Sequence, residues 1–229
     1  MKVVEIFSSI DGEGSRAGFL CTFIRLYGCN LRCNYCDSLY ALENNYYTEM
    51  TCEEIINKCV ELGNFRITLT GGEPLIHNNV IELIQGLLDK GFYVNIETNG
   101  SIDLTDVKFT QFKSSNLFYT VDYKCTGSGV NNTMCINNFC NGALSNNDII
   151  KFVVSDEQDL KQMSNVVKHY INTSAKFGPC RIPQFYVSPV FGRIEPVTIV
   201  NYLKSADEQN IKLQIQLHKI VWDPNEKGV

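Results

Sequence analysis

Three cysteines lie within the stretch CNLRCNYC and give the chain its clearest capacity for metal chemistry. They are Cys29, Cys33 and Cys36, spaced C-x3-C-x2-C. Structural zinc sites close with four protein ligands, and this run offers three. A cubic 4Fe–4S cluster is usually held by cysteine thiolates, and three thiolates leave one iron open to a small molecule. The alternative is a zinc site completed by a distant histidine or cysteine.

A second stretch suited to chemistry is TGGEP, Thr70 to Pro74, about forty residues after Cys29. It directly follows the expected strand RITLT. Glycines let a backbone approach a ligand closely, and Glu73 offers an acceptor or a charge. An ordinary strand-to-helix turn would also explain the motif taken alone. Its place behind the cysteines favours a shared site.

Strands and helices alternate along the chain and must position these motifs. The expected strands are TFIRLYG (22–28), RITLT (66–70), FYVNIET (92–98), LFYTVDYK (117–124), DIIKFVVS (148–155), QFYVSPV (184–190) and IKLQIQLHK (211–219). Helices are expected over 51–63, with Thr51 and Glu54 as a capping box and Gly63 at the end, and over 78–91. Two more are expected over 156–170, capped by Ser155 with Gln158, and near 196–209.

This alternation predicts an α/β fold with a mainly parallel sheet and right-handed crossovers. About six units are too few for a closed eight-stranded barrel, so we expect a partial (β/α)6-type barrel in a single domain, 1–229. Ligands bind at the C-terminal edge of parallel sheets. The segments 70–73, 97–100 and 122–124 fall at that edge. The Asn-rich stretch 131–147 is expected to be a loop or short helices.

Composition narrows the class of protein. The chain has 229 residues, 44% of them hydrophobic and 20% charged, which is typical of a soluble globular protein. A formal net charge of -5 argues against nucleic-acid binding. No apolar run reaches the ~20 residues of a membrane span, and Glu5 interrupts the start where a signal peptide would be apolar. We therefore expect no membrane partner and a cytoplasmic location. Ten cysteines in a reducing compartment suit metal or redox chemistry.

The triad and TGGEP resemble the two motifs of the radical S-adenosylmethionine enzymes. In that superfamily the open iron binds S-adenosylmethionine, whose reductive cleavage yields a 5′-deoxyadenosyl radical that removes a hydrogen atom from the substrate. The segments EIFSSIDGEGSRAGFLCTFIRLYGCNLRCNYCDS, IETNG, DYKCTGSG, YVSPVFG and QLHKIVWDP resemble the 7-carboxy-7-deazaguanine synthase family nearly end to end. That family converts 6-carboxy-5,6,7,8-tetrahydropterin to 7-carboxy-7-deazaguanine with loss of ammonia, on the route to queuosine, and magnesium assists.

The resemblance implies roles residue by residue. Cys29, Cys33 and Cys36 would bind the 4Fe–4S cluster. S-adenosylmethionine would contact Tyr35, Cys36, Asp37, Gly72, Glu73, Asp122, Tyr123, Lys124, Ser188, Pro189 and Val190. The pterin would contact Ile10, Asp11, Gly12, Glu13, Arg25, Thr70, Glu97, His218 and the terminal Val229. Mg²⁺ would be bound by Ser38. A homodimer and an external reductase such as flavodoxin or ferredoxin are also implied.

Several of these assignments compete with structural readings. Arg25 suits the substrate carboxylate, because a guanidinium can grip it with two bonds, but it could pair with a structural carboxylate instead. Glu13 and Glu97 suit the N–H donors of the pterin, but they could be solvated or cap a turn. His218, expected on the last strand, could be structural.

Two residues depart from the family pattern. Asp11 stands where the family has Gln, so a carboxylate that only accepts replaces an amide that also donates. Ser38 stands where the family has Thr; its hydroxyl can still bind Mg²⁺, although serine is less restricted at χ1.

Other functions remain open from the sequence. A glycyl-radical activating enzyme shares the cysteine motif but acts on a protein. A non-catalytic iron–sulfur or metal-binding module would leave GGEP and ETNG without a role. Four later cysteines, Cys125, Cys135, Cys140 and Cys180, could bind a second cluster, although their spacing fits no compact ligand pattern.

Overall fold

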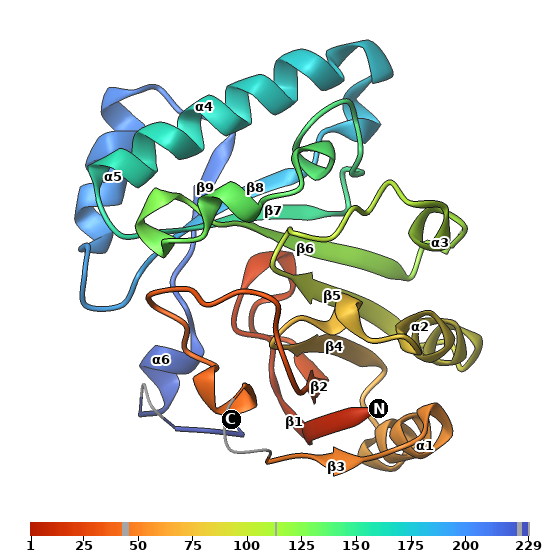
Figure 1. The fold of residues 1–229 in the computed structure, drawn as a ribbon. Helices are drawn as coiled ribbons and strands as arrows, with labels where there is room; N and C mark the ends of the chain where they lie inside the picture. Colours follow the sequence, from red (N-terminus) through yellow and green to blue (C-terminus); the bar gives the residue numbers. More distant parts are fainter. Residues whose placement is uncertain (43–45, 113, 224–225, 229) are drawn as a thin grey trace.

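A nine-stranded sheet runs through the computed structural model, which describes residues 1–42, 46–112, 114–223 and 226–228 (Figure 1). Its strands are β1 (Lys2–Ile10), β2 (Leu20–Leu26), β3 (Thr48–Glu49), β4 (Arg66–Gly71), β5 (Tyr93–Thr98), β6 (Leu117–Tyr123), β7 (Ile149–Val154), β8 (Gln184–Pro189) and β9 (Ile211–Leu213). The spatial order is β3-β1-β2-β4-β5-β6-β7-β8-β9.

The pairing from β2 to β9 is parallel throughout. Strand β1 pairs antiparallel with both β2 and β3 at one edge. The expectation of a mainly parallel, partial barrel is confirmed. Strand β1 is not among the predicted elements; buried and exposed residues do not alternate along it, since Val4 to Phe7 are all half-buried, so it lacks the pattern that marks a strand in a sequence.

Helices cover the outer side of the curved sheet, opposite the loop that carries the cysteines (Figure 1). They are α1 (Cys52–Leu62), α2 (Val80–Asp89), α3 (Val107–Thr110), α4 (Glu157–Ser174) and α5 (Pro196–Ser205), and a short α6 (His218–Val221) follows the last strand. The main core lies between helices and strands. Leu83 and Leu87 of α2, for example, are fully buried in the same cluster as Leu69 and Ile96.

Helix α1 begins and ends where its sequence predicts. The hydroxyl of Thr51 accepts a hydrogen bond from the Glu54 backbone N–H at 3.2 Å, and the Glu54 carboxylate accepts one from the Thr51 N–H at 2.7 Å. Gly63 ends the helix with a φ of 75°, which favours glycine. The reciprocal cap and the C-terminal glycine confirm both predicted boundaries.

Two local predictions are wrong. Asp156, not Ser155, caps α4 by accepting from the Asp159 N–H at 2.9 Å, while the Ser155 hydroxyl donates to the Asp159 carboxylate. The predicted strand 211–219 ends at Leu213, because the chain then leaves the sheet and donates from Leu217 N–H to the Gly12 carbonyl. His218 therefore begins α6 rather than lying on the last strand.

The Asn-rich stretch forms short 3-10 turns between β6 and β7, as predicted. No helix among the described residues is long and apolar enough to cross a membrane.

Candidate active site

A cavity of about 980 Å³ opens at the C-terminal edge of the parallel strands. Most residues singled out from the sequence lie on its wall: Ile10, Asp11, Gly12, Glu13, Arg25, Cys29, Cys33, Tyr35, Cys36, Asp37, Ser38, Thr70, Gly72, Glu97, Asp122, Lys124, Val190 and His218. Segments more than 200 positions apart in the sequence thus face one volume. Val229 lies outside the described residues.

The cysteine triad occupies the loop that follows β2, and all three thiols are free and half-buried. The Cys29 sulfur accepts from the Leu31 N–H at 3.3 Å and from the Asn99 side-chain amide at 3.5 Å. Burial raises the pKa of the Cys33 and Cys36 thiols, so a bound metal must displace their protons.

Three thiols in one loop suit a cluster, in which each thiolate binds a different iron, better than structural zinc, which closes with four protein ligands. Within the described residues no three Cys, His, Asp or Glu side chains are grouped closely enough to hold one metal ion. The same finding covers Cys125, Cys135, Cys140 and Cys180, which form no three-ligand site for a single metal ion.

The two glycines of TGGEP are required by backbone packing against the end of β2 and the start of the cysteine loop. A Cβ on Gly71, whose φ is 146°, would lie 2.2 Å from the Leu26 carbonyl oxygen. A Cβ on Gly72 would lie 2.2 Å from the carbonyl oxygen of Gly28, which also accepts from the Glu73 N–H at 2.9 Å. The turn after β4 thereby supports the loop that holds the thiols, a role additional to the close approach of a ligand.

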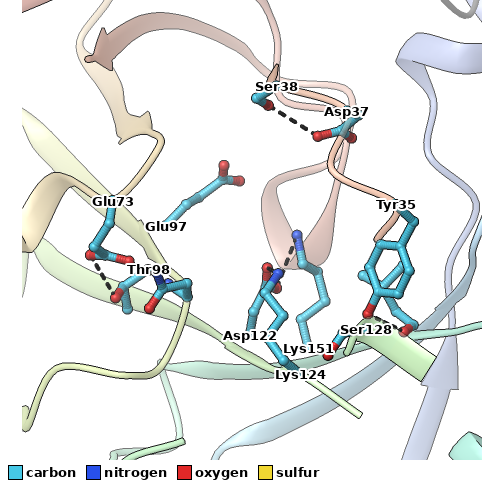
Figure 2. Close-up of polar contacts among 12 residues, drawn as sticks. Tyr35, Asp37, Ser38, Glu73, Glu97, Thr98, Asp122, Lys124, Ser128 and Lys151 are labelled. Carbon is cyan, nitrogen blue, oxygen red and sulfur yellow. Dashed lines mark hydrogen bonds and ion pairs between the residues drawn. The ribbon is translucent and has the colours of Figure 1, made fainter. Parts of the chain in front are cut away.

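Glu73 lies beneath the cavity wall and holds two motifs together (Figure 2). Its carboxylate accepts hydrogen bonds from the Leu75 N–H at 3.0 Å, the Thr98 hydroxyl at 2.9 Å and the Asn99 N–H at 2.6 Å. Burial raises the pKa of Glu73 to about 7, although the Asn99 N–H acts in the opposite direction. Glu73 therefore ties GGEP to ETNG.

Three other predicted cofactor residues do not line the cavity. Tyr123 packs its ring against Phe139 and Phe152. Ser188 and Pro189 are on β8, and the buried Ser188 hydroxyl has no hydrogen-bond partner among the described residues. Contacts of these residues with S-adenosylmethionine stay predictions.

An ionic network crosses the cavity floor (Figure 2). Lys124 lies 2.6 Å from Asp122, and Lys151 pairs with both Asp122, at 3.2 Å, and Glu13. The two lysines hold the pKa of Asp122 low even though burial alone would raise it. Lys151 was missed from the sequence; a charged residue inside the apolar run IIKFVV was the available signal.

Glu97 projects into the cavity from β5 (Figure 2). It accepts a hydrogen bond from the Thr70 hydroxyl at 2.9 Å. Burial raises the pKa of Glu97 to about 7; Lys151 lowers it, and the nearby carboxylates of Asp11 and Glu13 raise it. Such a carboxyl can accept or release a proton near neutral pH.

Arg25 is partly engaged by the protein itself. Its Nε donates to Glu5 at 2.7 Å, and the Tyr40 hydroxyl donates to the same oxygen at 2.8 Å. The structural pairing considered for Arg25 is therefore present, and it uses the Nε side of the guanidinium.

Asp11 is also engaged by its surroundings. It is 2% exposed and accepts from the Thr68 hydroxyl at 3.0 Å and from Arg16 Nε at 3.3 Å. These two donors compensate its charge, so the departure from Gln is accommodated by an ion pair.

His218 stands against the loop of Gly12, where an added Cβ would come within 2.8 Å of its Nδ1. Burial lowers the pKa of His218, against the opposing effect of Glu13. The imidazole lies on the cavity wall. The Ser38 hydroxyl, also on the cavity wall, donates to Asp37 at 3.0 Å, which places two oxygen ligands of the kind Mg²⁺ prefers side by side (Figure 2).

Comparison with known proteins decides the family. The Radical SAM superfamily matches residues 23–120. A 7-carboxy-7-deazaguanine synthase from Clostridium acetobutylicum is 46% identical over 100% of this chain and 99% of its own length. This chain belongs to the 7-carboxy-7-deazaguanine synthase family.

Other members of the 7-carboxy-7-deazaguanine synthase family agree with this placement. A synthase from Chlorobaculum tepidum is 34% identical over 100% of this chain and 97% of its own length. The crystal structure of QueE from Escherichia coli has the same fold, with a TM-score of 0.71 at 21% identity over 95% of this chain and 94% of that one.

Membership of this radical S-adenosylmethionine family implies two cofactors, a 4Fe–4S cluster and S-adenosylmethionine. It also decides among the functions left open by the sequence, in favour of the synthase over an activating enzyme or a non-catalytic module.

Proposed function

We propose that this chain, acting as one domain over 1–229, converts 6-carboxy-5,6,7,8-tetrahydropterin to 7-carboxy-7-deazaguanine with loss of ammonia. The observation that carries the proposal is the single cavity. It brings the thiols of a cluster loop to the same volume as the guanidinium of Arg25 and a set of carboxylates. The arginine can bind the carboxylate of the pterin, and the carboxylates can accept hydrogen bonds from the N–H groups of the pterin ring.

Cys29, Cys33 and Cys36 are the proposed cluster ligands. When bound, the cluster and S-adenosylmethionine supply the radical that removes a hydrogen atom from the substrate. The backbone of Tyr35 to Asp37, with Gly72, Asp122 and Lys124, is the proposed cradle for S-adenosylmethionine. Lys124 already pairs with Asp122 in this part of the floor, at 2.6 Å.

The substrate side is built by this chain's own polar groups. Arg25 is proposed to bind the pterin carboxylate through its terminal nitrogens, since its Nε is held by Glu5. Glu13 and Glu97 are proposed to accept the ring N–H donors. Because the pKa of Glu97 is about 7, it is also the residue best suited to hold a proton during rearrangement.

Mg²⁺ is proposed at Ser38, with Asp37 as a neighbouring oxygen donor. A homodimer, an external reductase such as flavodoxin or ferredoxin, and a cytoplasmic location complete the proposal. The homodimer and the reductase follow from the family resemblance, because the cluster must be reduced before it cleaves S-adenosylmethionine. The location is the one expected from the sequence.

The decisive experiment is anaerobic reconstitution of the cluster, followed by incubation with S-adenosylmethionine, Mg²⁺, a reductant and the carboxytetrahydropterin. The expected result is a product with the mass of 7-carboxy-7-deazaguanine, formed in excess over the S-adenosylmethionine consumed. Cleavage of S-adenosylmethionine without that product would point to another substrate. Absence of cleavage with every reductant would contradict radical chemistry.

A further inference from the structure

Lys151 is a lysine buried at the floor of the cavity, on an inner strand of the parallel sheet. It lies on β7 directly opposite Asp122 of β6 and Tyr186 of β8, and its side chain is 11% exposed. Its neighbours Ile150 and Phe152 are fully buried in the core beneath the helices. Because side chains alternate along a strand, Lys151 points to the opposite face, into the cavity.

The ammonium of Lys151 contacts two carboxylates that come from different parts of the site. Nζ lies 2.5 Å from Glu13 Oε2 and 3.2 Å from Asp122 Oδ1. Glu13 belongs to the loop proposed to bind the pterin, and Asp122 to the segment proposed to bind S-adenosylmethionine. Lys151 thus joins the substrate side to the cofactor side; Figure 2 shows its contact with Asp122.

Each carboxylate keeps a second partner on its far oxygen. Glu13 Oε1 accepts from the Gln216 side chain at 2.6 Å, and Asp122 Oδ2 lies 2.6 Å from Lys124. With Lys151 removed, both acids would remain tethered at one oxygen but lose the contact that sets their orientation. Lys151 therefore matters more for the placement of these two acids than for the fold.

The Oδ1 atom of Asp122 depends on its contact with Lys151. Oδ1 is buried and has no well-formed hydrogen bond among the described residues. Lys151 is the cation that faces this oxygen, at 3.2 Å, while Lys124 faces the other one. With Lys151 removed, Oδ1 would stay buried without that contact, and because an unsatisfied buried oxygen is costly, the carboxylate would take up a proton or move.

The geometry points to Lys151 as a positioning residue for the reaction: it orients Glu13 toward the N–H donors of the pterin and ties that orientation to Asp122 on the cofactor side. This inference rests on the proposed pterin substrate. It assigns no bond-making step to Lys151. It requires that the effect of Lys151 on substrate binding pass through Glu13.

The test is a double-mutant cycle of Lys151→Met and Glu13→Gln, with two readouts. The first is the dissociation constant of the carboxytetrahydropterin for the reconstituted holoenzyme without reductant, where no turnover occurs. The second is the ratio of 5′-deoxyadenosine to product in the reductant-driven reaction. Lys168→Met removes a lysine from another ion pair, with Glu208 at 2.8 Å outside the cavity, and serves as the matched control.

For Lys151→Met we expect a dissociation constant raised at least about tenfold and a deoxyadenosine-to-product ratio raised several-fold, because a misplaced substrate lets the radical be quenched. In the Glu13→Gln background the same change should have a much smaller effect, since residues acting as a unit are not additive. Lys151→Arg, which keeps the charge, should restore part of the affinity. Lys168→Met should leave both readouts unchanged.

The inference is overturned if Lys151→Met lowers only the rate while the dissociation constant and the ratio stay at wild-type values, or if the two substitutions are additive. If Lys151→Met does not fold, the same two readouts are measured on Lys151→Arg and on the double variant. The double variant removes one positive and one negative buried charge together. Failure of those folded variants to change pterin binding also overturns it. Absence of product from the wild-type protein would instead contradict the proposed function.

Discussion

The Nε of Arg25 donates a 2.7 Å hydrogen bond to the carboxylate of Glu5, across the antiparallel pair of β1 and β2. This contact fixes the plane of the guanidinium and occupies one of its two sides. The terminal nitrogens remain for a planar carboxylate in the cavity. A residue that seemed from the sequence to be either structural or functional is thus proposed to be both.

Arg25→Lys is expected to raise the KM for the carboxytetrahydropterin by about tenfold or more, because an ammonium cannot replace a fork of two parallel N–H donors. Glu5→Gln should raise it less, since the amide oxygen can still accept from Nε. Steady-state kinetics measure both. Arg66→Lys, outside the cavity, is the control. An unchanged KM for Arg25→Lys would remove this arginine from the substrate site.

The protonation of Glu97 should make the stability of the folded protein depend on pH. Its pKa of about 7 in the folded protein lies above the ordinary value of 4.5, so the folded state holds a proton that the unfolded chain has released. The free energy of unfolding should therefore fall as the pH rises from about 4.5 through 7. Glu73, whose pKa is also about 7, contributes in the same direction.

Glu97→Gln should flatten that dependence. Between pH 5 and pH 8 the variant should lose less free energy of unfolding than the wild type does, by about 1 kcal/mol or more. Denaturant unfolding at the two pH values measures the difference. Glu61→Gln, on the exposed surface of α1, should leave the slope as it is. A slope in Glu97→Gln identical to that of the wild type would contradict the raised pKa.

Glu73→Gln is expected to cost about 1–3 kcal/mol of stability. The amide nitrogen would face the N–H of Asn99 or Leu75, and one of the buried hydrogen bonds would be lost. Because the Asn99 side chain contacts the Cys29 sulfur, iron retention should fall as well. Unfolding curves and iron analysis test this, with the exposed Glu82→Gln as control. Full stability with normal iron would show that the three hydrogen bonds contribute little.

Ser38→Ala is expected to raise the Mg²⁺ concentration needed for half-maximal activity at least about tenfold, because a hard ion loses an oxygen ligand. Ser38→Thr should restore the wild-type requirement or improve on it, since threonine is stiffer at χ1. A Mg²⁺ titration of activity measures both. Wild-type activity in excess chelator equal to that with added Mg²⁺ would remove magnesium from the proposal.

Cys33→Ala should abolish both the brown colour of the reconstituted cluster and turnover, since a thiolate ligand is lost. Cys180→Ala, at an exposed cysteine, should keep both. Iron analysis of the wild type should give about four irons per chain. A value near eight would mean that the later cysteines bind a second cluster.

The sequence alone carries much of this fold. The capping box of α1, the glycine that ends it and the succession of parallel strands along the chain follow from local signals, because caps and hydrophobic periodicity depend on neighbouring residues. The chemistry of the cysteine loop is local in the same sense: three thiols within one short loop must share a site.

Tertiary structure decided what depends on contacts between distant segments. His218 leaves the last strand because Leu217 bonds to Gly12, and no local pattern encodes that meeting. Glu73 turned out to lie under the cavity wall, and Lys151 emerged as the link between Glu13 and Asp122. Charge compensation in a buried site is a property of which side chains meet, so residue types and spacing identify the chemistry while folding assigns the partners.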